Sequence, residues 1–265
     1  MKGAPNPVSL TIAGSDSAGA SGIQADLKTF AALGVHGATV VTAITAQNSQ
    51  RVLSIQPTTP GLVRRQLDAV LAESPVAAAK TGMLFSAGII GVVADFFRRH
   101  PGIPLVVDPV MLSTSGGRLL QKSGVKVLTE RLLPRATLVT PNRMEAEALL
   151  KMEIRNGQDL QLAAHEIHHR FGCAALVKGG HGQGGGNAVD FFFDGKIDLV
   201  LTARRIAGPP TRGTGCVYSA AIAALLSRRM PLRDAVQMGK KFVTRAIVMS
   251  YPLGDHRILR PGSES

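Results

Sequence analysis

The sequence contains no tryptophan and few aromatic residues of any kind. Phe, Trp and Tyr together make up 4% of the 265 residues, so the aromatic platforms on which single-stranded nucleic acids stack are poorly supplied. The formal charge of +12 comes from scattered single and paired basic residues rather than a dense basic run. Nucleic-acid binding is therefore disfavoured, and the basic surface is expected to attract small anionic ligands.

Cysteines and long apolar runs are also scarce. Cys173 and Cys216 form no disulfide framework and no cysteine-based zinc site. No run of 18 apolar residues could cross a bilayer, and the apolar segment near the N-terminus is too short for a signal peptide. We therefore expect a cytoplasmic protein without a membrane partner. The oligomeric state is left open, with a homodimer among the alternatives.

What the chain does have is a regular alternation of apolar runs and helical patterns. With 45% hydrophobic residues it can build one large core, and we expect a single domain over residues 1–265 with 261–265 as a frayed tail. The apolar runs typical of buried strands lie at 8–13, 38–44, 76–80, 104–108, 136–140 and 174–178. Their order predicts an α/β fold with a mostly parallel central sheet and helices on both faces.

Caps and turns mark where several elements begin and end. Thr59 before Pro60, and Ser86, are predicted helix N-caps. Asp194–Gly195 predicts a hairpin within 191–201, which we place as a small antiparallel element at the sheet edge. Later helices are predicted at about 142–151, 157–171, 214–229 and 232–249.

Polar segments follow the predicted strands at the point where each strand ends. They read GSDS, TAQNS, KTGM, DPVM, TPNRMEAE and KGGHG, in chain order. Ligands of open α/β sheets bind beyond the carboxyl ends of the strands. The sequence therefore predicts one site built from many loops.

Two glycine-rich segments precede predicted helices. GTGC (213–216) allows backbone N–H groups to face an anion at a helix N-terminus. The helix dipole there should favour the thiolate of Cys216, although a plain helix start with a buried cysteine is the alternative. AGSDSAGASG (13–22) partly matches a phosphate-binding P-loop, but Ala20 stands at the lysine position. We expect that loop to hold something other than a triphosphate.

Two further features carry alternatives. HEIHH (165–169) matches the zinc motif H-E-x-x-H, but helical periodicity turns His165 and His169 away from the apolar stripe and toward solvent. With no third ligand in view, a metalloprotease is disfavoured. Cys173 lies in the apolar segment FGCAALV and is interpreted as a small core residue.

Taken together, the motifs resemble the hydroxymethylpyrimidine/phosphomethylpyrimidine kinases of thiamine biosynthesis, which have the ribokinase-like fold. The resemblance covers about residues 8–230 and rests on the opening block AGSDSAGASGIQADLKTF together with TAITAQNS, KTGML, VVDPVM, TPNRMEAEAL, VKGGH and GTGC. It departs at Arg212, where the family usually has histidine, and within 182–211, on the ATP side.

This resemblance implies that ATP phosphorylates 4-amino-5-hydroxymethyl-2-methylpyrimidine and then its monophosphate, giving the diphosphate. It implies a substrate pocket formed by Gly14, Asp16, Asp26, Gln47 and Met83, with Met83 against the ring. The side-chain amide of Gln47 also offers the donor and the acceptor that an aminopyrimidine edge requires. An ordinary polar loop residue is the alternative for Gln47.

For the phosphates, the resemblance implies that Lys178, Thr211 and Asn142 bind ATP, while Glu145 and Asp108 hold Mg²⁺ directly or through water. Glu145 could equally be a helix first-turn residue favoured by the dipole. The implied catalytic residues, which form the anion hole and take the hydroxyl proton, are Gly213, Gly215 and Cys216.

Two other functions stay open at this point. A pyridoxal kinase of the same fold would share the ATP machinery and differ only in the acceptor pocket. A non-catalytic pyrimidine-binding module would leave Lys178, Glu145 and the GTGC segment without a task.

Overall fold

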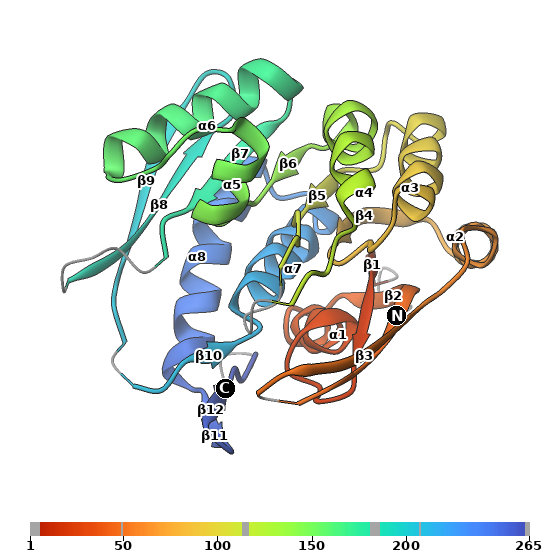
Figure 1. The fold of residues 1–265 in the computed structure, drawn as a ribbon, viewed down its shortest axis with the longest axis horizontal. Helices are drawn as coiled ribbons and strands as arrows, with labels where there is room; N and C mark the ends of the chain where they lie inside the picture. Colours follow the sequence, from red (N-terminus) through yellow and green to blue (C-terminus); the bar gives the residue numbers. More distant parts are fainter. Residues whose placement is uncertain (1–5, 49, 113–116, 181–185, 207, 263–265) are drawn as a thin grey trace, which may run out of the picture.

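The chain folds around a nine-stranded sheet, seen in a computed structural model that describes residues 6–48, 50–112, 117–180, 186–206 and 208–262. The strand order is β3-β2-β1-β4-β5-β6-β7-β8-β9 (Figure 1). The strands are β1 (Val8–Asp16), β2 (His36–Gln47), β3 (Val52–Pro57), β4 (Val76–Thr81), β5 (Leu105–Val107), β6 (Leu138–Val139), β7 (Ala174–Lys178), β8 (Asn187–Phe193) and β9 (Asp198–Arg204). Residues 263–265 of the predicted tail lie outside the described residues.

The parallel core predicted from the apolar runs is confirmed. β1, β2, β4, β5, β6 and β7 pair in parallel, and β8 and β9 continue the sheet as an antiparallel hairpin at one edge. The hairpin turns at Asp194, whose carboxylate accepts hydrogen bonds from the N–H groups of Lys196 and Ile197. The antiparallel β3 at the other edge was not predicted, because none of its residues is buried and it shows no buried apolar run.

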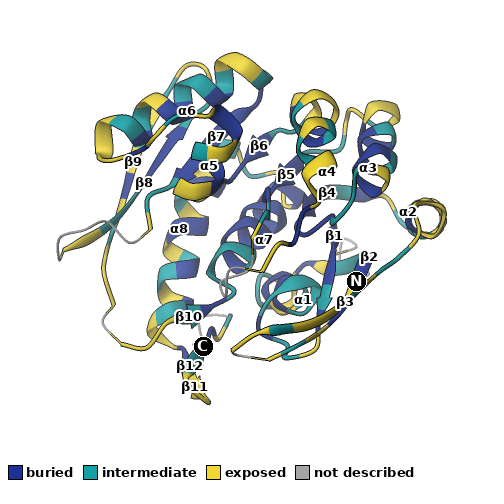
Figure 2. Ribbon diagram, viewed as in Figure 1, coloured by how far each residue is buried: buried dark blue, intermediate teal, exposed yellow. Residues whose placement is uncertain are grey.

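Helices cover both faces of the sheet, as expected. One face carries α2 (Pro60–Glu73), α3 (Ala87–Arg99), α4 (Lys122–Val127), α5 (Arg143–Leu150) and α6 (Gly157–Phe171), and the other carries α1 (Gly22–Ala32), α7 (Thr214–Ser227) and α8 (Leu232–Val248). A π-helical turn (Leu128–Leu132) and a 3₁₀ turn (Leu133–Arg135) follow α4. In Figure 2, helices such as α3, α6 and α8 show both buried and exposed stretches, whereas α7 is buried along most of its length.

The predicted N-caps are present. The hydroxyl oxygens of Thr59 and Ser86 accept hydrogen bonds from the N–H groups of Leu62 and Ile89. Helix α7 begins differently, at Gly213 with a φ of 80° and no side-chain cap. Because α7 is buried on almost all sides after its first turn, its N-terminus is its open part.

A separate three-stranded sheet lies beside the start of α7. Its order is β10-β12-β11, with β10 (Thr211–Arg212), β11 (Tyr251–Leu253) and β12 (His256–Ile258). β10 pairs in parallel with β12, which brings the C-terminal hairpin against the segment that leads into α7. Within the described ranges, none of the helices combines the length and the apolar character needed to cross a bilayer.

Candidate active site

The carboxyl ends of the parallel strands open into one cavity of about 470 Å³. Every site residue predicted from the sequence lines it except Asp26; these residues are Gly14, Asp16, Gln47, Met83, Asp108, Asn142, Glu145, Lys178, Thr211, Gly213, Gly215 and Cys216. The cavity is where polar loop segments from distant parts of the chain meet, because parallel strands end at the same edge of a sheet. Lining a cavity does not assign a role, so the individual roles stay predictions.

The opening loop is organised around the Asp16 carboxylate. Oδ1 accepts from the N–H of Ala18 at 2.8 Å, and Oδ2 accepts from the N–H and the hydroxyl of Ser21 at 2.8 and 2.7 Å. Burial alone would raise the pKa of this carboxyl, but hydrogen bonds from Gln47, Ser21 and the backbone hold it below its ordinary value. The N–H groups that a P-loop offers to phosphate are thus already occupied by an internal carboxylate.

Gln47 and Met83 lie on the same side of the cavity as this loop. The side-chain amide nitrogen of Gln47 is 3.5 Å from the Ser21 hydroxyl. Met83 packs at Gly14, where a Cβ atom would come within 3.2 Å of its sulfur. The absence of a side chain at Gly14 therefore leaves room for the Met83 thioether at the wall of the cavity.

Asp26 lies behind the cavity wall. Both of its carboxylate oxygens accept from Nζ of Lys80, at 3.0 and 2.9 Å, and Oδ2 also accepts from the Thr11 hydroxyl at 2.6 Å. Neither side chain of the ion pair is solvent-exposed, and Lys80 rather than Asp26 lines the cavity. Asp26 therefore reaches the cavity only through Lys80, and its predicted role in substrate binding stays a prediction.

Lys80 was missed as a site residue, although it could have been noticed as a lone lysine at the end of the buried strand VAAAKT. Burial alone would lower the pKa of Lys80, but the neighbouring acidic groups, Asp26 foremost, together hold this pKa above its ordinary value. Lys80 is therefore a charged group beneath the cavity.

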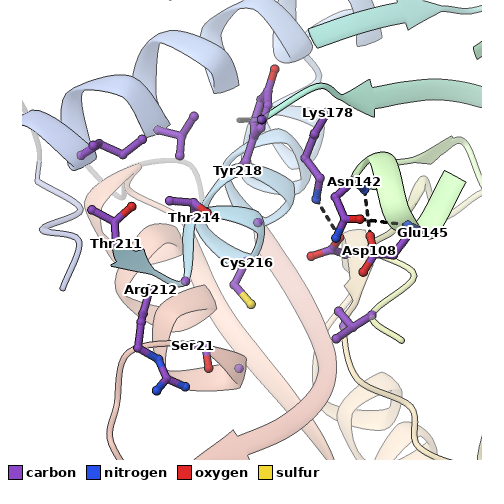
Figure 3. A pocket seen from close by; sticks show the side chains of 18 of the residues that line it. Ser21, Asp108, Asn142, Glu145, Lys178, Thr211, Arg212, Thr214, Cys216 and Tyr218 are labelled. Carbon is purple, nitrogen blue, oxygen red and sulfur yellow. Dashed lines mark hydrogen bonds and ion pairs between the residues drawn. The ribbon is translucent and has the colours of Figure 1, made fainter. Parts of the chain in front are cut away.

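The opposite side of the cavity gathers Lys178, Asp108 and Glu145 (Figure 3). Nζ of Lys178 donates to Oδ1 of Asp108 at 3.1 Å. Burial raises the pKa of Glu145 to about 7; Lys178 opposes this rise and Asp108 adds to it. A cation and two closely spaced carboxylates thus converge on one wall.

Glu145 and Asn142 also form the start of α5. Oε2 of Glu145 accepts from the N–H of Asn142 at 2.8 Å, and Oδ1 of Asn142 accepts from the N–H of Glu145 at 2.9 Å. This reciprocal capping box is the structural role that the sequence left open for Glu145. An isolated parallel β-bridge also pairs the backbone of Asn142 with that of Lys178, the last residue of β7.

The carboxylates on this wall fit a magnesium ion that is also coordinated by the phosphates of a ligand, rather than a metal coordinated by protein side chains alone. Among the residues the structure describes, no group of three or more His, Cys, Asp or Glu side chains could hold a metal. Mg²⁺ favours one or two carboxylates completed by phosphate oxygens and water. Asp108 and Glu145 provide that number of carboxylates.

The GTGC segment forms the third wall. Gly213 has a φ of 80°, and a Cβ atom there would lie 2.0 Å from the carbonyl oxygen of Ala20. A Cβ atom at Gly215 would lie 3.3 Å from Nζ of Lys178 and 3.4 Å from Oδ2 of Asp108. The first glycine therefore permits contact with the opening loop, and the second brings Lys178 and Asp108 to the N-terminus of α7, where the first-turn N–H groups have no intrahelical acceptors.

The predicted stabilisation of the Cys216 thiolate is wrong. Burial raises the pKa of this thiol to about 11; Lys80 lowers it in part, whereas Asp26 and Asp108 raise it further. A helix dipole stabilises charge by only about 0.3–1 kcal/mol at an exposed end, which is too little to offset desolvation beside two carboxylates. Cys216 is therefore a thiol at neutral pH.

A third ion pair, also missed from the sequence, lies farther along the cavity. Nζ of Lys240 on α8 donates to Oδ2 of Asp190 on β8 at 2.7 Å. The buried hydroxyl of Tyr218 has no hydrogen-bond partner within the described ranges. No motif marked these residues, because α7, α8 and β8 come together only in the folded chain.

In the HEIHH segment, His165 contacts the β8–β9 hairpin. Nε2 of His165 lies 2.6 Å from Oδ1 of Asp198, and the His165 ring stacks on Phe193 with a centroid distance of 4.0 Å. His165 thus contacts the β8–β9 hairpin instead of facing solvent freely, whereas His169 is exposed as expected. Cys173 is buried in the core, as predicted.

Comparison with known proteins gives a consistent result. Residues 16–259 match the family described as phosphomethylpyrimidine kinase. The chain is 43% identical over 252 residues to the hydroxymethylpyrimidine/phosphomethylpyrimidine kinase of Synechococcus elongatus, covering 94% of each protein. It is 44% identical over 245 residues to the thiamine biosynthesis bifunctional protein ThiED of Geobacter sulfurreducens, covering 92% of this chain and only 50% of that protein.

Solved structures of related kinases have the same fold. The ADP complex of Bacillus subtilis pyridoxal kinase superposes with a TM-score of 0.89 at 35% identity, covering 97% of this chain and 98% of the other. The phosphomethylpyrimidine kinase of Clostridium difficile superposes with a TM-score of 0.81 at 38% identity, covering 91% of this chain and all of the other. The ribokinase-like expectation is thereby confirmed, since these are kinases of that fold.

Proposed function

Since this chain belongs to the phosphomethylpyrimidine kinase family, we propose that its cavity carries out two successive transfers from ATP. The first acceptor is 4-amino-5-hydroxymethyl-2-methylpyrimidine, and the second is its monophosphate. The chain is a phosphotransferase of thiamine biosynthesis. One relative, with 44% identity, is named a thiamine biosynthesis bifunctional protein, and another, with 43% identity, is named a hydroxymethylpyrimidine/phosphomethylpyrimidine kinase; each match covers more than nine tenths of this chain.

The observation that carries the proposal is the arrangement around the start of α7. Lys178 and Asp108 lie against Gly215, and the uncapped N–H groups of the first helical turn open into the same cavity. Phosphoryl transfer requires mainly positioning and the neutralisation of charge on the phosphate oxygens. A lysine and a helix N-terminus on one wall supply both.

The acceptor side is assigned to the wall formed by Gly14, Gln47 and Met83. The amide of Gln47 pairs with the polar edge of the aminopyrimidine, and the Met83 thioether packs on its ring. Asp16 acts indirectly by holding the opening loop, and Asp26 acts through Lys80. Thr211 and Asn142 are assigned to the nucleotide side.

Mg²⁺ is proposed as the cofactor shared with ATP, held by Asp108 and Glu145. When bound, it would neutralise and orient the phosphate groups. The raised pKa of Glu145 beside Asp108 supports this assignment, because two neighbouring carboxylates lack a full counter-charge in the protein alone.

Cys216 is assigned to the acceptor hydroxyl in the first transfer. Its thiolate takes the hydroxyl proton while the oxygen attacks the γ-phosphorus, the bond from that phosphorus to the bridging oxygen breaks, and ADP leaves with the electron pair. Since burial raises the thiol pKa to about 11, only a small fraction is thiolate at neutral pH, and this assistance grows as the pH rises.

Pyridoxal kinase is the second candidate, favoured by the similarity to the Bacillus subtilis enzyme over nearly the whole of both chains. It would use the same phosphate machinery and differ in the acceptor pocket. A non-catalytic binding module is disfavoured, because the Lys178–Asp108 pair at the α7 N-terminus would then have no ligand to act on.

One coupled assay of ATP consumption separates these candidates. Hydroxymethylpyrimidine, its monophosphate and pyridoxal are compared at equal concentration, and turnover of both pyrimidines above pyridoxal is expected. Preferential turnover of pyridoxal would move the chain to the second candidate, and no turnover of any acceptor would refute the kinase assignment of this cavity.

The magnesium assignment is tested in the same assay. Activity should require Mg²⁺, and Glu145→Gln should raise the Mg²⁺ concentration needed at saturating ATP. Glu147→Gln is the matched control, because Glu147 lies on the same helix and does not line the cavity. An unchanged metal dependence in Glu145→Gln would count against Glu145 as a ligand.

A further inference from the structure

Arg212 differs from every other buried cation at the cavity. It is only 6% exposed, it lines the cavity, and it precedes Gly213 at the end of β10. In Figure 3, Cys216 lies between Arg212 and the group formed by Lys178, Asp108 and Glu145, and Arg212 lies on the side of Ser21. The guanidinium is thus on the acceptor side of the site.

The lysines of the cavity are each paired with a carboxylate. Nζ of Lys80 is 2.9 Å from Asp26, Nζ of Lys178 is 3.1 Å from Asp108, and Nζ of Lys240 is 2.7 Å from Asp190. These three positive charges are already compensated inside the protein.

Arg212 has no such carboxylate partner among the residues the structure describes. One terminal nitrogen donates to the backbone carbonyl of Asn48, and Nε is buried without a hydrogen-bond partner. A guanidinium is always charged, and a buried charge is costly unless an anion compensates it. An unpaired guanidinium and an orphaned N–H at a ligand cavity therefore indicate a site for an anion supplied by the ligand.

The two acceptors of the proposed function differ in this respect. Hydroxymethylpyrimidine is neutral, whereas its monophosphate carries a phosphate group that must approach the γ-phosphate of ATP. The guanidinium donates to the carbonyl of Asn48, the residue that follows Gln47, with which the pyrimidine is proposed to pair. In the monophosphate acceptor, the phosphate group is therefore the anion that can reach Arg212.

We propose that Arg212 binds the phosphate of the monophosphate acceptor and thereby promotes the second transfer selectively; this inference rests on the proposed function. In that transfer an oxygen of the acceptor phosphate forms a bond to the γ-phosphorus. The bond from the γ-phosphorus to the bridging oxygen breaks, and ADP leaves with that electron pair. Arg212 offsets the repulsion between the two phosphates and takes no proton.

The test compares both acceptors in Arg212→Met. Because Arg212→Met removes a charge-assisted contact, we expect kcat/KM for the monophosphate to fall by about 10- to 100-fold. The value for hydroxymethylpyrimidine and the KM for ATP should change by less than about threefold, within the scatter of an uninvolved site. Titration of the monophosphate without ATP should show the same weakening.

Two further variants sharpen the result. Arg212→Lys keeps the charge and should recover part of the second transfer. Arg212→His should support the second transfer better at acidic pH, where imidazole is protonated. Arg257→Met is the matched control, because it removes one charge from the neighbouring strand β12, across from Thr211, and it should leave the ratio of the two activities unchanged.

The outcomes are distinct. If the wild type phosphorylates neither acceptor, the proposed function fails. If the wild type phosphorylates both and Arg212→Met lowers both equally, Arg212 is only a clamp on Asn48 and the inference is overturned. A selective loss of ATP affinity would also overturn it, by assigning Arg212 to the nucleotide.

Discussion

Two helices of this protein begin in glycine-rich loops, and the two beginnings lie against each other. The carbonyl oxygen of Ala20, in the loop before α1, occupies the space that a Cβ atom at Gly213 would need. Both loops follow a strand and both look able to hold phosphate. Only the loop before α7 leaves its N–H groups open to the cavity.

The difference lies in what fills each loop. Before α1, the Asp16 carboxylate accepts from the N–H groups of Ala18, Ala20 and Ser21, so an internal anion occupies the position of a phosphate. At α7 the N-cap is a glycine without a side chain, and Lys178 lies nearby. A glycine-rich loop before a helix therefore indicates an anion site only when no acidic residue of the loop fills it.

The largest effect is expected from Gly213→Ala. A side chain there would collide with Ala20 and would have to adopt a φ of 80°, which displaces the loop of α7. We expect kcat/KM to fall by about 10³-fold for both acceptors, the scale of losing preorganised anion donors. Gly34→Ala is the control, since Gly34 has a similar φ of +67° with nothing within 4 Å of a Cβ atom, and it should keep full activity. Near-normal turnover in Gly213→Ala would show that the α7 loop is not the anion site.

Cys216→Ala tests the same helix start without moving its backbone. Because only a small fraction of this thiol is ionised at neutral pH, we expect kcat for hydroxymethylpyrimidine to fall little there and by up to about 10²-fold at the alkaline end of the accessible range. With a thiol pKa raised to about 11, the thiolate fraction and the wild-type rate should rise with pH over the whole accessible range. That rise should be absent in the variant.

Alkylation gives an independent measure of this thiol. Its rate at Cys216 should increase with pH, without a plateau near the ordinary value of about 8.5, and bound pyrimidine should slow it. Cys173→Ala is the control and should keep the wild-type kcat. If Cys216→Ala matches the wild type in rate and pH profile, Cys216 is a packing residue.

Gln47→Ala tests the acceptor side and should spare the phosphate side. Truncation leaves the polar edge of the pyrimidine without its partner, and we expect binding to weaken by about 1–3 kcal/mol. ATP affinity should not change. Gln50→Ala is the matched control, because Gln50 is an exposed glutamine three residues further along. Equal weakening of both ligands by calorimetric titration would remove Gln47 from the acceptor pocket.

The smallest effect is expected from Asp16→Asn, which weakens the internal anion of the first loop. We expect the free energy of unfolding at pH 7 to fall by about 1–2 kcal/mol, because one oxygen and its hydrogen bonds remain. The folded pKa of Asp16 is below its ordinary value, so this stability is present above the unfolded pKa and is lost as the pH falls through the folded pKa. Urea unfolding at several pH values should therefore show that the difference in unfolding free energy between wild type and Asp16→Asn shrinks in acid. A difference that does not depend on pH would contradict this prediction.

Much of the architecture could be predicted from the sequence. The runs at 76–80 and 174–178 became β4 and β7 because strands buried on both faces are apolar at nearly every position. Thr59 and Ser86 capped their helices because their hydroxyls satisfy N–H groups locally. The gathering of the GTGC segment, Lys178 and Asp108 followed from the shared edge of parallel strands.

The remaining features depend on partners that are distant along the chain. The exposed edge strand β3 and the two-residue strand β10 carry too little local pattern, since they form only by pairing with β2 and β12. Lys80 stands out in the sequence only as a lone lysine in an apolar strand, and its partner Asp26, 54 residues away, is identified only in the folded core. Arg212 is an ordinary arginine in the sequence, and only folding buries its Nε without a hydrogen-bond partner in the part of the chain that the structure describes.

The sequence by itself determined most of the helices, the strands of the parallel core and which loop ends meet, because periodicity, caps and strand direction are local properties. The tertiary structure alone decided the charge state of each group at the meeting point. It made Cys216 a thiol rather than a thiolate, paired three lysines with carboxylates, and left Arg212 without a carboxylate partner among the described residues. Desolvation and Coulomb energies depend on burial and on distances of a few ångströms between distant residues, and no local pattern encodes those distances.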